Sequence, residues 1–452
     1  PETTPDDIHG LFAAQGVLTS HGGMTSHAAV VARGLGKPCV SGAETVKIDL
    51  AAETFTVGDV TVKKDEYLTL DGSNGDVIVG KMELIDPQFD DNFRELLDDA
   101  DKIAKLQVWA NADTPEDARR ARAFGAKGIG LCRTEHMFMD ADRLPVMQEM
   151  VVASTKEERI VQLDKLQVMQ ESDFYGIFEA MEGLPVTIRL LDPPLHEFLP
   201  KIPELTKALE TLDPNSAEAQ KIQATIARAR ELHEQNPMLG FRGCRLGMIY
   251  PEIYEMQVRA IFDAACKLTK KGVKVIPDIM IPLVGTKFEM KAMRDLVDEV
   301  AKQKLAEHGV ELEYMVGTMI ELPRAAMVAD QLAEYAQFFS CGTNDLTQTT
   351  FGYSRDDAEG KFLGQYVEMG VFEQNPFAQL DRDGVGGLMT IAAEKGRKTR
   401  PGIQIGICGE HGGNPSSIAF CNSLNFNYVS CSPFRVPVAR LSAALAAMGV
   451  IK

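Results

Sequence analysis

The chain has 452 residues, of which 45% are hydrophobic and 25% are charged. This is the composition of a globular protein, and the length allows two or three domains. The formal net charge of -18 argues against a nucleic-acid-binding surface and gives no overall attraction to anionic lipid. The sequence also has no run of about 18 apolar residues that would cross a membrane. We therefore expect neither nucleic acid nor a membrane as a partner.

The cysteines indicate the compartment. The eight cysteines are scattered singly, without a CxxC pair or the spacing of a secreted disulfide framework, which favours a reducing environment. We therefore expect a cytoplasmic protein. A location in an organelle stays an alternative, because the chain begins at Pro1 without a start methionine and reads as a fragment or a processed chain. Any targeting segment would have preceded Pro1.

Residues 1–85 predict a small mixed α/β domain that presents one loop. Short β-rich segments alternate with turns over residues 15–19, 39–42, 53–57, 67–70 and 76–79. The following residues, 86–105, are acidic and helix-prone, with apolar side chains spaced so that they could form one stripe. They predict a helical linker to a second body.

The loop of the first domain carries a histidine in an unusual setting. Two glycines permit a tight turn, and Thr25 or Ser26 can cap a helix that has His27 in its first turn. An imidazole there stands among unpaired backbone N–H groups at the positive end of the helix dipole, which favours a bound anion and a neutral ring. A lone histidine more often only helps to cap a helix. The loop therefore predicts an anion site beside a neutral nucleophile only if the rest of the chain agrees.

Residues 106–452 alternate short apolar segments with amphipathic helical ones. About eight such strand and helix pairs in one chain predict a (β/α)8 TIM barrel. A helix-rich insert over about residues 193–250 would be an excursion on the catalytic side of the barrel. The candidate strands lie at residues 106–110, 128–131, 186–190, 275–280, 314–320, 338–341, 404–407 and 428–431.

Polar residues stand where a barrel of this kind places its catalytic groups, just after the C-terminal ends of the strands. Two arginines there fit the oxygens of a small anion with paired hydrogen bonds. Glu321 and Asp345 offer the hard oxygen ligands that Mg2+ prefers. The strand ends carry Arg133, Arg189, Glu321, Gly342, Thr343, Asn344, Asp345 and Cys408.

Each of these residues also has a plainer interpretation. An arginine at a strand end often pairs with a neighbouring carboxylate, Glu321 can cap the helix that follows it, and Cys408 can be a small buried hydrophobe. Cys408 and His411 resemble half of a zinc site, but no second pair of ligands completes it. The set as a whole, rather than any member, indicates a divalent metal and a small anion.

Six segments together resemble the phosphoenolpyruvate-utilising enzymes: residues 22–42, 131–136, 187–200, 236–247, 338–348 and 408–413. The resemblance covers essentially the whole chain and is strongest to the pyruvate phosphate dikinase branch. Two sister branches, phosphoenolpyruvate synthase and enzyme I of the sugar phosphotransferase system, typically carry arginine where this chain has Met24. Neither typically has the segment at residues 190–200.

The resemblance implies a role for each matching residue. His27 would be the phosphoryl carrier, and Cys408 would protonate the methylene carbon of the pyruvate enolate. Glu321 and Asp345 would hold Mg2+ and are also implied in substrate binding. Thr25 matches a threonine that a regulatory protein phosphorylates in plant members. The remaining residues implied in binding phosphoenolpyruvate or pyruvate are Arg133, Arg189, Gly342, Thr343 and Asn344, with Arg242 and Arg355 as phosphate contacts.

The resemblance also implies partners. The branch's N-terminal nucleotide-binding domain, of ATP-grasp type, has no counterpart in this chain, so we expect only half of the cycle: phosphoenolpyruvate and His27 give pyruvate and phosphohistidine, reversibly. A homodimer through the barrel is implied as well. Three alternatives stay open, namely a phosphoenolpyruvate synthase, a carrier that passes its phosphate to a protein partner as enzyme I does, and a fragment that binds ligand without catalysis.

Overall fold

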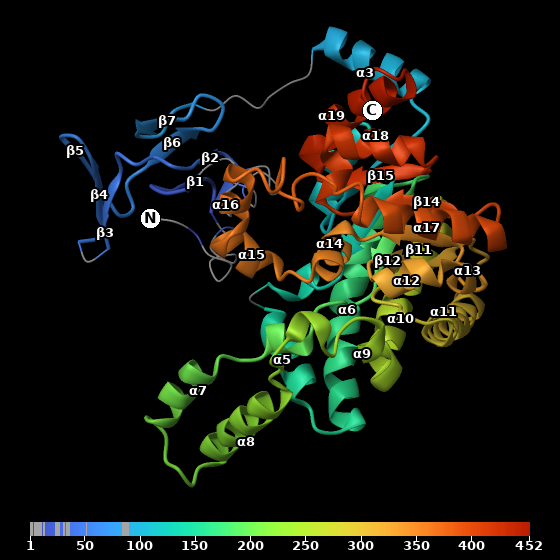
Figure 1. The fold of residues 1–452 in the computed structure, drawn as a ribbon. Coiled ribbons are helices and arrows are strands. Elements are labelled where there is room, and N and C mark those ends of the chain that lie inside the picture. The colour runs from blue at the N-terminus through green and yellow to red at the C-terminus, as the bar shows by residue number, and fades with distance from the viewer. Residues whose placement is uncertain are drawn as a thin grey trace. The chain divides into compact units, whose positions relative to one another are not determined.

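The computed structural model describes residues 3, 11, 14–22, 28–29, 32, 37–50, 52–83, 90–140 and 142–452 (Figure 1). The chain forms two compact units. One contains Pro1–Lys102 and Thr347–Asp381, and the other contains Ile103–Leu346 and Arg382–Lys452. The domain bounds expected from the sequence, at 1–85, 86–105 and 106–452, stay a prediction.

The second unit is a closed barrel of eight parallel strands. Neighbouring strands pair in chain order, and the last strand pairs with the first, with Ser430 opposite Trp109. The barrel predicted from the sequence is confirmed, and every predicted strand segment overlaps an observed one. The strands are β8 (Gln107–Asn111), β9 (Ile129–Arg133), β10 (Pro185–Arg189), β11 (Ile276–Ile281), β12 (Met315–Ile320), β13 (Phe338–Cys341), β14 (Gln404–Ile407) and β15 (Tyr428–Cys431).

Helices follow the strands and cover the barrel (Figure 1). Two of the longest start with capping boxes, Thr155 with Glu158 and Thr286 with Glu289, in which side chain and backbone satisfy each other's hydrogen bonds. Gly309 ends one of them in the left-handed region, at φ 61°. The covering helices are α4 (Pro115–Ala123), α6 (Lys156–Ala180), α10 (Pro251–Lys270), α11 (Lys287–His308), α12 (Pro323–Met327), α13 (Ala329–Leu332), α17 (Val385–Thr399), α18 (Pro415–Ser423) and α19 (Val436–Ala447).

The insert between β10 and β11 is helical, as expected. It contains two helices that pack on each other, α7 (Ile202–Leu209) and α8 (Ala217–Leu232). Figure 1 shows these two helices extending away from the barrel. Its last part returns to the barrel through α9. The elements of this region are η3 (Leu195–Phe198), α7 (Ile202–Leu209), α8 (Ala217–Leu232), η4 (Pro237–Leu239) and α9 (Cys244–Ile249), and α5 (Leu144–Val152) precedes it.

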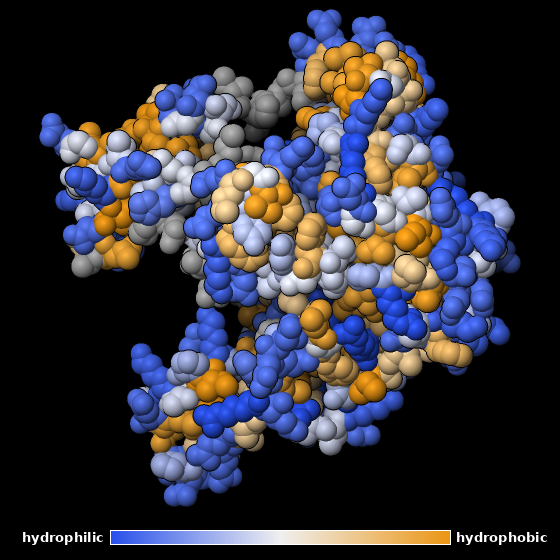
Figure 2. All heavy atoms as spheres, viewed as in Figure 1, coloured by the Kyte–Doolittle hydropathy of each residue, from blue (hydrophilic) through white to orange (hydrophobic). Residues whose placement is uncertain are grey.

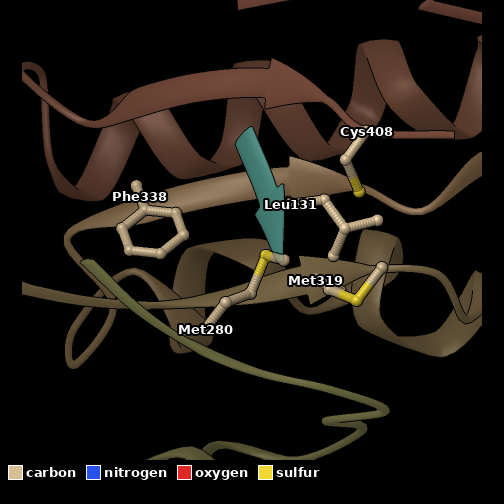
Figure 3. Close-up of a cluster of buried hydrophobic side chains, with 5 residues drawn as sticks. All are labelled: Leu131, Met280, Met319, Phe338 and Cys408. Carbon is tan, nitrogen blue, oxygen red and sulfur yellow. The ribbon is translucent and has the colours of Figure 1, made fainter. Parts of the chain in front are cut away.

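The interior of the barrel is packed by side chains from different strands. Figure 3 shows one such cluster, in which Cys408 points toward Leu131. The other members of this cluster are Met280, Met319 and Phe338. Elsewhere in the barrel the ring of Trp109 stacks on that of Tyr428, with centroids 4.1 Å apart. The barrel is therefore a filled core, and a ligand would bind at its end.

Gly406 of β14 gives a direct test of this packing. A Cβ atom at Gly406 would overlap the ring of Tyr428, whereas one at Gly402, before the same strand, would meet no heavy atom of the described chain within 4 Å. We therefore expect Gly406→Ala to lower the free energy of unfolding by about 1–3 kcal/mol. Gly402→Ala is the control and should leave it nearly unchanged. Denaturant unfolding of both variants measures the effect, and equal stabilities would contradict the packing.

The first unit holds short strands in separate small sheets. Strands β1 (Val17–Leu18) and β2 (Cys39–Val40) pair in parallel. Strands β6 (Leu68–Asp71) and β7 (Asp76–Val79) form a hairpin. These four fall in the segments predicted from the sequence. A three-stranded antiparallel sheet is made by β3 (Lys47–Asp49), β4 (Thr54–Val57) and β5 (Val60–Lys63).

Two of those strands, β3 and β5, were not expected from the sequence, because each is short and largely exposed. Their apolar periodicity is therefore weak. The unit also contains α3 (Asp91–Ile103), α15 (Arg355–Lys361) and α16 (Leu363–Glu368), with α3 inside the segment predicted as a helical linker. The last residue of α3, Ile103, belongs to the second unit.

The surface is mixed in polarity. On the face drawn in Figure 2, hydrophilic side chains cover much of the surface, and hydrophobic side chains appear in scattered patches among the hydrophilic ones. Within the residues that the structure describes, no helix has both the length and the apolar content needed to cross a membrane. Each of the eight cysteines lies in the described part of the chain and is a free thiol.

Candidate active site

Arg189, the last residue of β10, is 8% exposed and is fixed by two carboxylates. Its guanidinium pairs with Glu135, which follows β9, and with Asp192 at 2.9 Å. Burial alone would lower the pKa of Arg189, but the two carboxylates raise it well above its ordinary value. Arg189 is therefore a permanent positive charge at the C-terminal end of the barrel, held in a fixed direction.

Asp192 joins Arg189 to a second arginine. The Arg242 guanidinium donates to Asp192 at 2.7 Å and to Asp345 at 3.3 Å. Arg242 lies between η4 and α9, so the insert contributes a buried cation to the end of the barrel. Burial would raise the pKa of Asp192, but the two guanidinium groups lower it. Asp192 was not predicted as a site residue, although it lies within the segment at 190–200 that carries the family resemblance.

Glu321 and Asp345 are the two carboxylates that the sequence assigns to a metal. Glu321 follows β12, is 1% exposed and accepts the backbone N–H of Leu283 at 2.6 Å. Burial, together with the carboxylates of Asp192 and Asp345, raises the pKa of Glu321 well above its ordinary value. Burial also raises the pKa of Asp345, against the opposing effect of Arg242. Negative charge on Glu321 and on Asp345 is therefore disfavoured at this place, beside the ionised Asp192.

The loop after β11 helps to set the position of Glu321. Leu283 has a φ of 56°, in the left-handed region that a bulky residue rarely adopts. This conformation goes with the hydrogen bond from its N–H to Glu321, while its carbonyl accepts from the Cys244 thiol at 3.3 Å. Strain of this kind persists where the surroundings fix it, which is typical of functional sites.

The segment after β13 lies next to Glu321. A Cβ atom on Gly342 would come within 2.6 Å of the Met319 methyl and 2.7 Å of a Glu321 carboxylate oxygen, so a larger residue there would displace these side chains. Thr343 begins α14 (Thr343–Phe351) and its hydroxyl lies 2.7 Å from Nδ1 of the buried His411. Asn344 is half-buried in the same first turn. The structure thus brings the predicted residues 342–345 to the end of the barrel beside Glu321.

Cys408 follows β14 and is 1% exposed. Its Sγ lies 3.8 Å from the Cys341 carbonyl, and its other neighbours in the cluster of Figure 3 are apolar. Burial raises the pKa of the thiol to about 11, with the Ser340 hydroxyl opposing this rise. At neutral pH the group is a protonated thiol, which suits a proton donor and does not suit a thiolate nucleophile.

Arg133, at the end of β9, belongs to a further group of charged residues. Its backbone N–H donates to Asp113 at 2.6 Å, and its guanidinium lies 3.6 Å from the same carboxylate. Asp113 also accepts from Nδ1 of His136 at 2.8 Å. No site residue was predicted for the first strand of the barrel. Asp113 lies two residues after β8, where the rule used for the other strands would have found it.

Three of the predicted residues lie outside the described part of the second unit. His27 and Thr25 lie outside the described residues, and the helical Ala28, Ala29 and Ala32 are the described parts of the helix expected there. Arg355, on α15 of the other unit, pairs with Glu359 at 3.3 Å and lies over the ring of Phe377. The roles of these three residues stay predictions.

Two family descriptions match the chain. Residues 89–448 match "PEP-utilising enzyme, PEP-binding domain", and residues 1–75 match "PEP-utilising enzyme, mobile domain". Among curated proteins, the chain is 55% identical over 450 residues to pyruvate, phosphate dikinase of Rhizobium meliloti, covering 98% of this chain and 49% of that protein.

A plant relative is similar to the same degree. The chloroplastic pyruvate, phosphate dikinase 1 of Arabidopsis thaliana is 54% identical over 443 residues, which cover 98% of this chain and 46% of the relative. The chain spans about half the length of the curated relatives it matches. The first match alone covers most of the chain, and the barrel with its charged end is the part that it describes. The chain therefore belongs to the PEP-utilising enzyme family.

Proposed function

We propose that this chain carries out the phosphoenolpyruvate half of the pyruvate phosphate dikinase reaction. In this half, phosphoenolpyruvate and His27 give pyruvate and phosphohistidine, and the step is reversible. In the complete reaction, ATP, pyruvate and phosphate give AMP, phosphoenolpyruvate and diphosphate. An ATP-grasp nucleotide-binding domain would perform the remaining steps as a partner. The names of the curated relatives support this choice over the alternatives.

One observation carries the proposal: two buried arginines, the buried carboxylates of Asp192 and Glu321, the half-buried carboxylate of Asp345 and a protonated thiol converge on one end of the barrel. Arg189 and Arg242 share Asp192, and Arg242 also contacts Asp345. Paired guanidinium groups recognise the oxygens of carboxylate and phosphate. A substrate that carries both groups on a small frame, such as phosphoenolpyruvate, fits this arrangement, and Arg133 is a third arginine in reach of the same end.

Mg2+ fits the remaining charges. Glu321 is buried and Asp345 is half-buried. Loss of solvent and neighbouring negative charge raise the pKa values of both carboxyl groups, and a bound cation would relieve this effect. Across the described ranges, no cluster of three or more His, Cys, Asp or Glu side chains is arranged as a metal site. Two protein carboxylates suit Mg2+, which takes its other ligands from substrate and water. When bound, it would neutralise negative charge on the phosphate and on the departing enolate.

The chain's own residues then account for the chemistry. His27 attacks phosphorus as the neutral imidazole, so that a nitrogen–phosphorus bond forms while the bond from phosphorus to the enol oxygen breaks. The released enolate takes the proton from Sγ of Cys408 at its methylene carbon and becomes pyruvate, and the thiolate regains a proton from solvent. The arginines hold the substrate's oxygens throughout, and Gly342, Thr343 and Asn344 line the same end of the barrel.

Four further features accompany the proposal. Arg355 contacts phosphate once His27 reaches the barrel, and Thr25 is a candidate for regulatory phosphorylation. The chain assembles as a homodimer through the barrel. It works in a reducing compartment, in the cytoplasm or in an organelle, without nucleic acid or membrane as a partner. The free cysteines support the choice of compartment.

A single-turnover experiment tests the proposal. The chain is mixed with excess phosphoenolpyruvate and Mg2+ and quenched over time, and pyruvate is quantified. We expect a burst of about one pyruvate per chain, because each His27 accepts one phosphoryl group. His27→Ala should give no burst. A burst of equal size in His27→Ala would overturn the carrier assignment, and no pyruvate from the wild type would overturn the proposal as a whole.

A further inference from the structure

Asp113 makes contacts that the proposed mechanism does not use. It is 14% exposed and lies in the loop between β8 and α4. One of its oxygens accepts the backbone N–H of Arg133 at 2.6 Å. The other accepts Nδ1 of His136 at 2.8 Å and lies 3.6 Å from the Arg133 guanidinium. A single carboxylate thus fixes the backbone and the side chain of a substrate-binding arginine and the ring of a histidine.

The contacts between Asp113, Arg133 and His136 determine the charges of Asp113 and His136. Burial alone would raise the pKa of Asp113, but the His136 ring, with help from Arg133, lowers it to about 2. Burial would likewise lower the pKa of His136, but the Asp113 carboxylate raises it above its ordinary value. Asp113 is therefore a carboxylate at neutral pH, and His136 is held toward its protonated form.

Other charged groups around His136 come from its own loop and from the elements packed on it. Glu135 also favours the protonated ring, and Arg133 opposes it. Next to η2 (His136–Phe138), the guanidinium of Arg143 donates to the Met137 carbonyl at 3.1 Å and is paired with Asp173 of α6. Asp113 is an acidic partner that directly contacts the ring, at 2.8 Å.

We propose that Asp113 is a positioning residue that holds Arg133 and a protonated His136 together as a two-cation cradle for the anionic substrate. The inference rests on the proposed function. Asp113 next to Arg133 would by itself cancel the arginine's positive charge and weaken its attraction for an anion. When His136 is protonated, the group of Asp113, Arg133 and His136 carries a net charge of one positive unit. Asp113 can then hold Arg133 in place while the group still attracts an anion.

The proposal has a defined dependence on pH. The raised pKa of His136 means that the ring is protonated below that value and neutral above it. Binding of phosphoenolpyruvate should therefore be strongest at low pH and weaken as pH rises through the pKa of His136. By linkage, a bound anion must in turn raise that pKa further. The substrate's own phosphate titrates in the same range, so the reference is the variant in which only the histidine charge is missing.

The test uses the whole chain with Mg2+ and two substitutions. His136→Gln can keep a hydrogen bond to Asp113 without a charge, and Asp113→Asn keeps an acceptor for the Arg133 backbone. NMR titration of the histidine rings gives the pKa of His136 with and without phosphoenolpyruvate, and calorimetry gives the affinity. The pair of His308 and Asp263, also at 2.8 Å but on the outer helices α11 and α10, is the matched control, with His308→Gln as its variant.

We expect phosphoenolpyruvate to raise the pKa of His136. In His136→Gln the affinity should fall about three- to tenfold at about pH 6.5 and match the wild type at about pH 9. In Asp113→Asn the pKa of His136 should fall toward about 6.5. His308→Gln should bind as the wild type does, and all variants should keep the wild-type melting temperature within a few degrees.

The outcomes separate this inference from the proposed function. If the wild type binds phosphoenolpyruvate but the pKa of His136 does not respond, or if His136→Gln binds equally well at every pH, the cradle is wrong and the proposed function stands. If the wild type does not bind phosphoenolpyruvate at all, both are overturned. An equal loss of affinity at all pH values in His136→Gln would indicate a purely structural role, and that result also contradicts the proposal.

Discussion

Cys408→Ala should abolish the formation of pyruvate from phosphoenolpyruvate, with a rate loss of about a hundredfold or more, since general-acid catalysis contributes on that scale. The affinity for phosphoenolpyruvate should change by no more than about threefold, because a neutral thiol does not pair with the substrate's charged oxygens. The thiol lies in an apolar cluster, and alanine fills most of its volume. Single-turnover kinetics and calorimetry measure the two effects.

Cys408→Ser is the matched variant for this prediction. Its hydroxyl has nearly the size of the thiol but is a far weaker acid, so it should restore packing without restoring turnover. A serine variant with wild-type turnover would return Cys408 to the role of a small buried hydrophobe. A loss of substrate affinity in both variants, with the rate of the bound complex unchanged, would likewise remove its assignment as the acid.

The raised pKa of Cys408 also determines how the rate depends on pH. Because burial raises it to about 11, the thiol is protonated throughout the neutral range. The step that gives pyruvate needs this acid and should not lose rate through its ionisation until pH approaches that value. The reverse step needs the thiolate and should accelerate as pH rises. Alkylation of Cys408 with a titration midpoint near neutral pH would contradict both statements.

Glu321→Gln should separate stability from activity. The raised pKa of Glu321 means that, above the value of an unfolded glutamate, its buried charge opposes folding when no cation is bound. The glutamine removes that charge and can still accept the Leu283 N–H, so without Mg2+ the variant should be at least as stable as the wild type at neutral pH. Turnover should fall about a hundredfold or more, because the charge that would hold Mg2+ is lost.

Thermal unfolding in Mg2+ and in chelator measures this separation. The wild type should gain melting temperature on addition of Mg2+, and Glu321→Gln should gain much less. Glu313→Gln is the control, since Glu313 is exposed just before the same strand, β12. It should respond to Mg2+ as the wild type does. A Glu321→Gln variant that keeps both full turnover and the full response to Mg2+ would show that Glu321 is not a metal ligand.

Much of the fold was predictable because the barrel repeats one simple pattern. Each buried parallel strand is a short apolar run bounded by turns, and the helix that follows has an apolar stripe, so the segments at β8 to β15 stood out. The polar residues that follow such strands then fall at one end of the barrel by topology alone. This is why Arg189, Glu321 and Cys408 could be placed before any geometry was known.

The electrostatic partners were not predictable in the same way. Asp192 bridges two arginines that are separated by 53 residues of the chain, and Asp113 supports an arginine on the next strand. A carboxylate acquires such a role from side chains that meet it in three dimensions, and no local spacing in the sequence encodes them. The direction of a pKa shift depends on the same three-dimensional contacts. The raised pKa of Cys408 could therefore be recognised only from the structure.

The fixed backbone of Leu283 is a further example. Its neighbours Pro282 and Val284 suggest an ordinary extended loop, yet Leu283 takes a φ of 56° and directs its N–H to Glu321. Residues with a side chain avoid this region unless their surroundings compensate. The compensation here comes from Cys244 and Glu321, which lie far from it in sequence.

The most direct test of the central claim is to locate the phosphoryl group. The chain is incubated with Mg2+ and phosphoenolpyruvate labelled at phosphorus, digested at alkaline pH where phosphohistidine survives, and mapped by mass spectrometry. The account predicts one acid-labile phosphate on His27, which added pyruvate removes with the return of labelled phosphoenolpyruvate. Label on any other residue, label that persists in His27→Ala, or no label in a chain that binds phosphoenolpyruvate would contradict it.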